Sequence, residues 1–415
     1  MNRRVLSGDT RRVLVAQALR AFAYGFGAVL LGSVLEHLGF GSLTTGLVLG
    51  AVVAGTVLAS LLVARFGDRW GRRRCYVALY VALAVTGAVF AEARSAWLLA
   101  AVALGGVLST DVVESGPFTS LEQAMLASEL SGRERLQGFG IYNAVATAAG
   151  SLGALAAALP SVFRHLWSGA PADQLWFWLF APVALAGAAV ASSLSSSAEA
   201  RPMSESGPKG TSSGRLTESR GLVVRLAGLF AIDSFGGGLV VQAFIAYWLI
   251  RRFGASTGTV GLVFFALGML QTASFVVAIK LGERFGLLRT MVFTHLPSNV
   301  LLVALAFSPT LPVAVGLLLA RVALSQMDVP ARQAYVMGLV APEERTAAAA
   351  YTNTARYLSR PAGPIVGGAL ASGAISSPFV VAGALKGAYD LMLWVWFRAI
   401  PLPESPPLDE EETGP

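Results

Sequence analysis

The stretch 64–74 concentrates charge between two long apolar runs. It holds one carboxylate, Asp68, and five arginines: Arg65, Arg69, Arg72, Arg73 and Arg74. A charged side chain at the centre of a bilayer costs about 3 kcal/mol even on lenient insertion scales. We therefore expect this stretch to form a tight turn at a membrane face. Any fold of this chain has to keep the turn outside the hydrocarbon while the runs on either side of it span.

Composition supports the same interpretation. The 415 residues are 55% hydrophobic and only 13% charged, whereas an ordinary soluble domain is about 25% charged. Apolar runs close to the length that spans a bilayer core, about 20 residues, recur along the whole chain. The chain is predicted to be an all-α polytopic membrane protein.

Twelve segments are long enough to span, and a polar stretch divides them into two groups of six. This stretch, 195–221, is rich in Ser, Gly, Pro and Glu, a composition typical of a flexible linker. We expect a six-helix bundle over 1–195, a cytoplasmic linker over 196–221, a second bundle over 222–400 and a disordered cytoplasmic tail over 401–415. The expected spans are 13–36, 43–64, 75–94, 96–114, 138–159, 175–195, 222–249, 257–280, 290–308, 310–328, 346–371 and 376–399.

The basic residues predict the orientation. One side of the membrane would hold 21 of the 31 lysines and arginines, and the opposite side would hold four: Arg94, Arg164, Arg251 and Arg252. Because basic residues gather on the cytoplasmic side, both termini are expected there, in a cell membrane. The same arginines explain the net charge of +7 without nucleic-acid binding. The first apolar run is expected to be a spanning helix and not a removed signal peptide.

The two halves repeat each other at a nearly constant offset. The charged turn returns in a weaker form at 282–289, where Glu283 lies 215 positions after Asp68. Later in each half the offset is 210, which relates Asp111 to Arg321. Further matched pairs are Thr44–Val48 with Thr259–Val263, Leu121–Ala124 with Ala331–Ala334, and Asn143 with Asn353. A parallel duplication of six helices is typical of a secondary transporter, with its binding site at mid-depth between the bundles.

The charged turn resembles the signature between helices two and three of the major facilitator superfamily, written G-x-x-x-D-R-x-G-R-R-R. The chain matches it at Asp68, Arg69, Gly71, Arg72, Arg73 and Arg74. It has Ala64 where the family prefers glycine, and alanine still permits close helix approach. The resemblance implies that family's fold, two six-helix bundles related by a pseudo-twofold axis.

The resemblance also implies a gating role for this turn, which would latch helix two against helix eleven in the outward-facing state. The matching gating residues of the second half are Glu283, Arg284, Gly286 and Arg289. The alternative is that the arginines only anchor the chain at the membrane face, but this explains neither Asp68 nor Gly71.

Ionisable residues inside spans are candidates for function. The resemblance implies that helices one, four, seven and ten line a central cavity, and each carries one such charge: Arg20, Asp111, Asp233 and Arg321. We hypothesise a polar cluster that exchanges partners between conformations, with Asp233 or Asp111 as the carboxylate that binds the proton. Desolvation favours the protonated form of a carboxylate, as proton coupling requires. The alternative is a static pair of salt bridges.

Helix eleven carries two further arginines, Arg356 and Arg360, which share one helix face. They suit an anionic substrate, or alternatively a partner among Asp390, Asp328 and Glu344. The following residues resemble the G-P-x-x-G-G motif of drug-exporting antiporters, which in those members lies on helix five. We expect a hinge here, or alternatively a packing kink, because proline removes a backbone hydrogen bond. Its residues are Pro361, Gly363, Pro364, Gly367 and Gly368.

Other polar residues are expected to play smaller parts. The segment 328–333 and the pair Glu122-Gln123 are predicted to run along the cytoplasmic face and contact the arginine turns. His295 is expected to be a peripheral hydrogen-bonded residue, and Lys386 to reach a membrane interface.

The function expected is proton-coupled export of a small drug-like or toxic compound by alternating access, in a monomer. The alternative is uptake or facilitated transport of a small organic anion or metabolite. An enzyme is not expected, because the chain has no H-E-x-x-H, G-x-S-x-G or Walker motif. It also has no Cys and His cluster for a metal, and no cofactor is expected. A sensor built on the same fold stays open as a further alternative.

Overall fold

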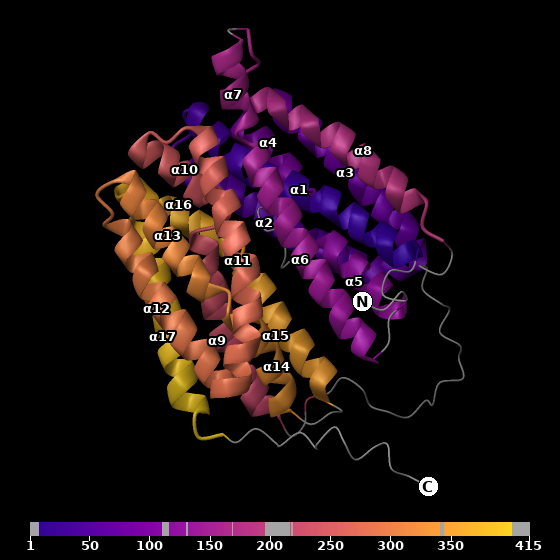
Figure 1. The fold of residues 1–415 in the computed structure, drawn as a ribbon, viewed down its shortest axis with the longest axis vertical. Helices are drawn as coiled ribbons and strands as arrows, with labels where there is room; N and C mark the ends of the chain where they lie inside the picture. The colour runs from indigo at the N-terminus through magenta and orange to yellow at the C-terminus, as the bar shows by residue number, and fades with distance from the viewer. Residues whose placement is uncertain are drawn as a thin grey trace.

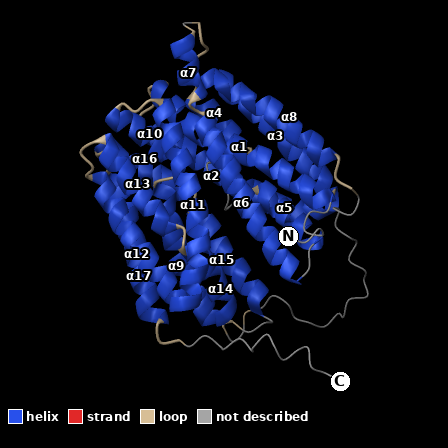
Figure 2. Cartoon of the chain, viewed as in Figure 1, coloured by secondary structure: helices blue, strands red, loops and turns tan. Residues whose placement is uncertain are grey.

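The computed structural model describes residues 8–109, 116–129, 132–167, 169–195, 216, 219–340 and 344–400, and these residues are almost entirely helical (Figures 1 and 2). The helices of the first half are α1 (Gly8–His37), α2 (Ser42–Trp70), α3 (Arg72–Glu92), α4 (Ala96–Ala103), α5 (Pro117–Glu129), α6 (Gly132–Ala156), α7 (Leu159–Leu166), the 3-10 helix η2 (Asp173–Leu179) and α8 (Phe180–Ser192). Those of the second half are α9 (Arg220–Leu239), α10 (Gln242–Phe253), α11 (Thr257–Phe285), α12 (Leu287–Ala306), α13 (Leu311–Ser325), α14 (Asp328–Leu339), α15 (Arg345–Ser359), α16 (Ala362–Gly373) and α17 (Ser377–Phe397).

Nine helical stretches in the described residues are long and apolar enough to cross a bilayer, and each overlaps a predicted span. Shorter helices overlap the three remaining predicted spans: α4 with 96–114, α13 with 310–328, and α15 and α16 with 346–371. Helix α4 is short, and it is followed by Gly105 and by Gly106, which has a φ of +76°. Helix eleven is divided at Pro361 into α15 and α16. The prediction of an all-α polytopic membrane protein is therefore confirmed.

Two segments predicted as loops contain helices. The predicted loop 115–137 includes α5, and the predicted loop 329–345 includes most of α14. Each helix buries apolar side chains against its own half: Phe118 and Leu126 from α5, and Tyr335 and Val336 from α14. Burial of this apolar face stabilises both helices. The polar residues of these segments suggest an exposed loop, but in the structure some of them are buried as well.

The helices form two bundles (Figure 1). In the first, α1 packs on α6 and α8, and α3 packs on α8. In the second, α9 packs on α15 and α17, and α12 packs on α13 and α17. The two arginine turns repeat each other in backbone as well as in sequence. Gly71 has a φ of 92° and Gly286 a φ of 85°, left-handed values that glycine adopts at little cost. The two glycines are 215 positions apart, the offset of the repeat.

The bundles meet chiefly along three helix pairs: α1 with α10, α2 with α16, and α6 with α11. Glycines permit close approach at each pair. Gly32 faces Ala246, Gly46 faces Gly368, and Gly261 faces the carbonyl oxygen of Ala154. We call this contact the seam. We call the membrane face nearest to the seam the closed face. It holds the helix ends His37, Ser42, Phe253 and Thr257.

The opposite face, which holds the two arginine turns, is called the arginine face. The principal contacts of α5, α14 and α15 at this face are with helices of their own bundle. In Figure 1 the bundles lie together near α7 and α10 and diverge toward the labelled N-terminus. The described residues therefore form a conformation that is joined at the closed face.

The arginine turn lies far from the part of helix eleven that α2 contacts. That part is α16, which meets α2 near Gly46, whereas the turn follows the other end of α2. At the turn, the Arg73 guanidinium donates a 3.1 Å hydrogen bond to the carbonyl of Leu194 in its own bundle. The side chains of Asp68 and Glu283 lie outside the described residues. The latch to helix eleven stays a prediction for another conformation.

We expect Gly46→Ala to destabilise the protein, because a Cβ at Gly46 would lie 2.8 Å from the Cα of Gly368 across the seam. Overpacking of this kind costs about 1–3 kcal/mol. Gly316→Ala is the control, since a Cβ there meets nothing within 4 Å, and alanine inside a helix stabilises by about 0.5–1 kcal/mol relative to glycine. Unfolding in a titration with SDS should begin earlier for the first variant and not for the second. Equal shifts in both would contradict the seam.

Candidate functional site

A buried ion pair joins α1 to α5 in the first bundle. The Arg20 guanidinium donates from Nε to Glu122 Oε1 at 3.0 Å and from Nη2 to Oε2 at 2.8 Å. Arg20 is 1% exposed and Glu122 is 0% exposed. The guanidinium also lies over the rings of Tyr24 and Phe118, at 5.2 and 5.8 Å from their centroids. A two-pronged pair of this kind fixes the two helices to each other.

Tyrosines complete the surroundings of Glu122. Tyr142 donates to Oε2 at 2.7 Å, and Tyr76 donates to Oε1 at 2.8 Å. With the two bonds from Arg20, the carboxylate accepts four hydrogen bonds and has few acceptor sites left. We therefore interpret this cluster, which we call the first-half pair, as a structural element of the bundle.

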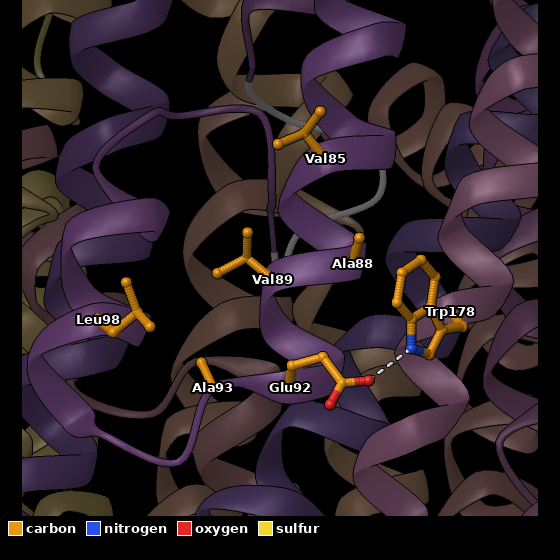
Figure 3. A pocket seen from close by; sticks show the side chains of 7 residues that line it. All are labelled: Val85, Ala88, Val89, Glu92, Ala93, Leu98 and Trp178. Atoms are coloured by element: carbon orange, nitrogen blue, oxygen red, sulfur yellow. Dashed lines mark hydrogen bonds between the residues drawn. The ribbon is translucent and has the colours of Figure 1, made fainter.

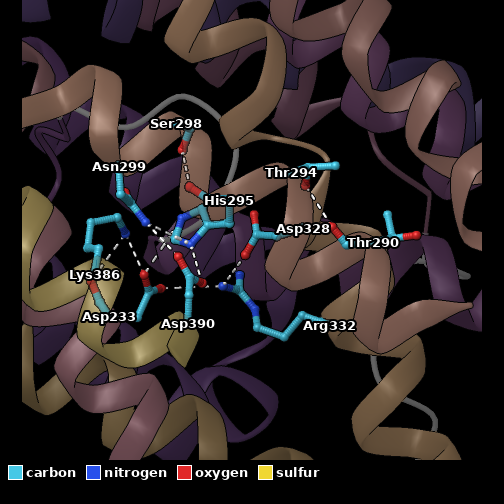
Figure 4. Close-up of polar contacts among 10 residues, drawn as sticks. All are labelled: Asp233, Thr290, Thr294, His295, Ser298, Asn299, Asp328, Arg332, Lys386 and Asp390. Atoms are coloured by element: carbon cyan, nitrogen blue, oxygen red, sulfur yellow. Dashed lines mark hydrogen bonds and ion pairs between the residues drawn. The ribbon is translucent and has the colours of Figure 1, made fainter. Parts of the chain in front are cut away.

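The second bundle buries a larger cluster between α9, α12, α14 and α17 (Figure 4). Its centre is Asp233 on α9, which is 4% exposed. The Lys386 ammonium from α17 donates to Asp233 Oδ1, and Arg332 Nη1 from α14 lies 3.5 Å from Oδ2. Arg332 also pairs with Asp328 at 3.1 Å. Two different cations thus contact one carboxylate.

A histidine links Asp233 to a second carboxylate. His295 on α12 places Nε2 3.9 Å from Asp233 Oδ1 and Nδ1 2.9 Å from Asp390 Oδ1. Asn299, one turn further along α12, donates to Asp390 Oδ2 at 2.8 Å. Figure 4 shows these side chains converging from four helices. We call Asp233, His295, Asp328, Arg332, Lys386 and Asp390 the second-half cluster.

Arg321 on α13 adds a further charge beside the cluster. It is attracted to Asp233, but its Nε is buried and has no hydrogen-bond partner in the described part of the chain. With His295 neutral, three carboxylates balance three cations, since Arg321 joins Arg332 and Lys386. A proton on His295 or on a carboxylate would leave one excess positive charge. Asp233 itself lies within 4 Å of Lys386, Arg332 and His295.

The repeat relates the two clusters to each other. Arg332 lies 210 positions after Glu122, and His295 lies 215 positions after Tyr80. Both halves thus place an ion pair between their first helix and the helix that follows their fourth span. The charges are reversed: the first helix carries Arg20 in the first half and Asp233 in the second. The hydroxyl of Tyr80 donates to the carbonyl of Ala16 at 2.6 Å, whereas His295 lies between two carboxylates, Asp233 and Asp390. The two halves therefore place different chemistry at this matched position.

The predicted four-charge cluster does not form as one unit. Arg20 pairs with Glu122 in the first bundle, while Asp233 pairs with Lys386 and Arg332 in the second. Among the three candidates that the structure describes, Asp233 and Arg321 lie within electrostatic reach of each other. The fourth candidate, Asp111, lies outside the described residues.

Four expectations were wrong for a common reason. Glu122 and Arg332 are not exposed along a membrane face, since both are buried in ion pairs although their helices, α5 and α14, lie at the arginine face. His295 is not peripheral and Lys386 does not reach an interface, because both contact Asp233 inside the bundle. The position of each residue was predicted from the sequence of its own helix alone, whereas the partner that buries it comes from another helix.

Anion binding by Arg356 and Arg360 stays a prediction, and the structure shows how the helix that carries them is attached to its bundle. Asp390 and Asp328, offered as partners for Arg356 and Arg360, contact His295 and Arg332 respectively. The Ser234 hydroxyl donates to the carbonyl of Arg356 at 2.8 Å, which ties α9 to the end of α15.

The glycine-proline segment begins where helix eleven divides. A Cβ at Gly363 or Gly367 would lie 2.5 Å from backbone atoms of α9, and one at Gly368 would lie 2.5 Å from the carbonyl oxygen of Ser42 on α2. Pro361 precedes α16, and Pro364 is buried within it. The segment therefore packs between α9 and the seam, and its role as a hinge stays a prediction.

Two surface hollows lie away from these charges. One, of about 390 Å³, is lined on the flank of the first bundle by Val85, Ala88, Val89, Glu92, Ala93, Leu98 and Trp178 (Figure 3). It is almost wholly apolar, apart from the Trp178 indole that donates to Glu92 at 2.9 Å. The other, of about 460 Å³, lies at the closed face near His37 and Arg164. Within the described residues, no group of three or more His, Cys, Asp or Glu side chains is placed to hold a metal ion.

Comparison with known proteins places this arrangement in a wider group. The family model described as Major Facilitator Superfamily matches residues 13–247 and 226–415. The uncharacterized membrane protein YJR124C of Saccharomyces cerevisiae is 24% identical over 425 residues, which cover 95% of each chain. The nucleoside transporter NupG has a TM-score of 0.70 at 13% identity, over 94% of this chain and 98% of that one. The human organic anion transporter MFSD10 has a TM-score of 0.62 at 20% identity, over 94% of this chain and 99% of that one.

Proposed function

The chain belongs to the major facilitator superfamily, and we propose that it is a secondary transporter that couples movement of a small organic solute to movement of protons. The solute would reach a site between the bundles, from one face of the membrane at a time. We propose that the bundles comprise 1–195 and 222–400 and move against each other at the seam, with 196–221 as their linker.

The observation that carries the coupling proposal is the second-half cluster. It places His295 between Asp233 and Asp390, so that a proton and two cations compete for the same carboxylate oxygens. Carboxylates and histidines inside membrane spans mark proton pathways in transporters. Binding or release of one proton would change which partner holds Asp233, and Asp233 lies on α9, whose continuation α10 forms part of the seam.

We propose that the arginine face is cytoplasmic, with both termini on that side of a cell membrane, because basic residues gather there. Export is the proposed direction, on the resemblance of the glycine-proline segment to the motif of drug-exporting antiporters. The working unit is proposed to be a monomer with no cofactor and no nucleic-acid partner.

A growth test in a host that lacks its own exporters examines this proposal. The host carries either the gene or an empty vector and is exposed to a panel of toxic organic compounds. Proton-coupled export is supported if the gene gives resistance to one compound and lowers its cellular accumulation, and if a protonophore raises the accumulation again. Higher accumulation of a compound in cells that carry the gene would instead indicate uptake, and no change with any compound would count against the proposal.

A second candidate is transport of a small organic anion, and Arg321 favours it. A buried guanidinium nitrogen without an acceptor is costly unless a partner arrives. Asp233, the countercharge of Arg321, is already contacted by Lys386 and Arg332. A carboxylate or phosphate of a substrate would supply the missing acceptor.

For this candidate we expect Arg321→Gln to raise the KM for an anionic substrate about tenfold, since a hydrogen bond to a charged group contributes about 1.5–3 kcal/mol. Arg321→Lys is the matched control, because it keeps the charge and loses the planar fork. A cationic or neutral compound should show no such rise. Unchanged KM for every anion tested would exclude Arg321 as the anion-binding residue.

A further inference from the structure

A second buried carboxylate lies at the closed face, far from the second-half cluster. Asp173 begins η2 in the first bundle and is 5% exposed. Arg164 of α7 pairs with its Oδ1 at 2.8 Å, and His37 at the end of α1 places Nδ1 3.8 Å from its Oδ2. These contacts remain within the first half of the chain and hold the carboxylate in place.

Asp173 also contacts the second bundle. Thr257, the first residue of α11, donates from its hydroxyl to Asp173 Oδ2 at 3.0 Å. The Ser33 hydroxyl of α1 lies 2.7 Å from the Thr257 hydroxyl and completes a buried chain of three side chains across the seam. Thr257 is 3% exposed and Ser33 is 0% exposed. Because these three side chains are at most 5% exposed, a hydrogen bond to the carboxylate is stronger than it would be at the surface.

The surrounding backbone shows that α11 begins in close contact with the first bundle. A Cβ at Gly258 would lie 2.5 Å from the hydroxyl of Ser161, and one at Gly261 would lie 2.5 Å from the carbonyl oxygen of Ala154. The N-terminus of α11 also carries a partial positive charge that favours a nearby carboxylate. A short distance away, the Tyr247 hydroxyl of α10 donates to the carbonyl of Phe40 at 3.2 Å, so a second polar contact crosses the seam.

From this geometry we propose that Asp173 is a gate residue of the transport cycle, and that its bond to Thr257 holds the closed face shut. Opening of this face would separate α11 from η2 and α1, so the bond has to break in every cycle. Arg164 and His37 stay with Asp173 when it breaks, because they belong to the same half. The proposal rests on the proposed function, since a gate is needed only if both faces open in turn.

Labelling of a single cysteine tests the gate without a substrate. Cys75 is the chain's only cysteine and is buried, so Cys75→Ser gives a clean background. Thr45→Cys then places a reporter on α2 at a position of 0% exposure, directly before Gly46, which packs against α16 in the seam. A membrane-impermeant maleimide is added from the side of the closed face, and the rate of labelling is measured.

In this background we expect Asp173→Ala and Thr257→Val each to raise the labelling rate about tenfold, because each removes a bond to a charged group across the seam. Thr259→Val is the control, since Thr259 is exposed and its hydroxyl contacts Ser256 at the same end of α11, on one side of the seam. Thr257→Val preserves side-chain volume, so it decides the result if Asp173→Ala fails to fold. Labelling of both variants at the parent rate would overturn the gate.

The outcome separates this proposal from the proposed function. Faster labelling in a protein that moves no solute would show that the bond holds the closed face shut and would reject the proposed transport. Proton-driven transport with unchanged labelling in both variants would keep the transporter and reject the gate.

Discussion

Glu122→Gln is expected to destabilise the protein by about 3–5 kcal/mol, because it leaves the buried charge of Arg20 without its partner. The double variant Arg20→Met with Glu122→Leu removes both charges together and should recover part of that loss, since an apolar pair is often similar in stability to a buried ion pair. The rest of the loss remains because the buried hydroxyls of Tyr76 and Tyr142 lose their acceptor. The free energy of unfolding is measured by titration with SDS.

Arg12→Met is the matched control for an arginine on the same helix. Arg12 pairs with Asp9 at 2.7 Å, but its side chain is 44% exposed, and a pair of this kind contributes about 1 kcal/mol or less. If transport by the double variant of Arg20 and Glu122 is still coupled to protons, the first-half pair is structural. The four hydrogen bonds that Glu122 accepts predict this result. Loss of coupling in a stable double variant would contradict that interpretation.

Asp233→Asn is expected to abolish transport driven by a pH gradient. The change leaves Lys386 and Arg332 without the carboxylate that both contact, and it removes the acceptor for which His295 competes. Flux is measured in proteoliposomes with an imposed pH gradient, using a compound identified by the growth test. Asp233→Glu keeps the charge and should retain part of the gradient-driven flux.

Stability has to be separated from coupling in this experiment, because breaking a buried pair also costs about 3–5 kcal/mol. Asp233→Asn combined with Lys386→Met removes one charge of each sign and should be more stable than Asp233→Asn alone. It should still fail to respond to the pH gradient. Gradient-driven flux at the wild-type level in the stable double variant would remove Asp233 from the coupling mechanism.

The sequence was sufficient to predict the fold, because spans and repeats are written in composition and spacing. Hydrocarbon excludes the five arginines of 64–74 whatever they contact, so the turn could be placed from one stretch alone. The offset of 215 positions predicted the second turn, and the matched φ angles of Gly71 and Gly286 agree with it.

The site was harder to predict, because it depends on contacts between distant helices. Arg20 and Glu122 are 102 positions apart, and Asp233 and Lys386 are 153 positions apart. One available signal was overlooked. Glu122 and Arg332 occupy matched positions with opposite charge, and such a reversal indicates that each has a partner of opposite sign in its own half. The polar character of the segments that contain Glu122 and Arg332 suggests surface exposure instead.

Proton movement driven by the solute tests the central claim most directly. Purified protein is reconstituted in proteoliposomes that contain a pH indicator, and the transported compound is added outside with no imposed gradient. Wild-type protein should change the internal pH as the compound moves, while the double variant of Asp233 and Lys386 should leave it unchanged. A pH change of wild-type size in that double variant, or none in a wild-type protein that moves the compound, would contradict the assignment of proton coupling to the second-half cluster.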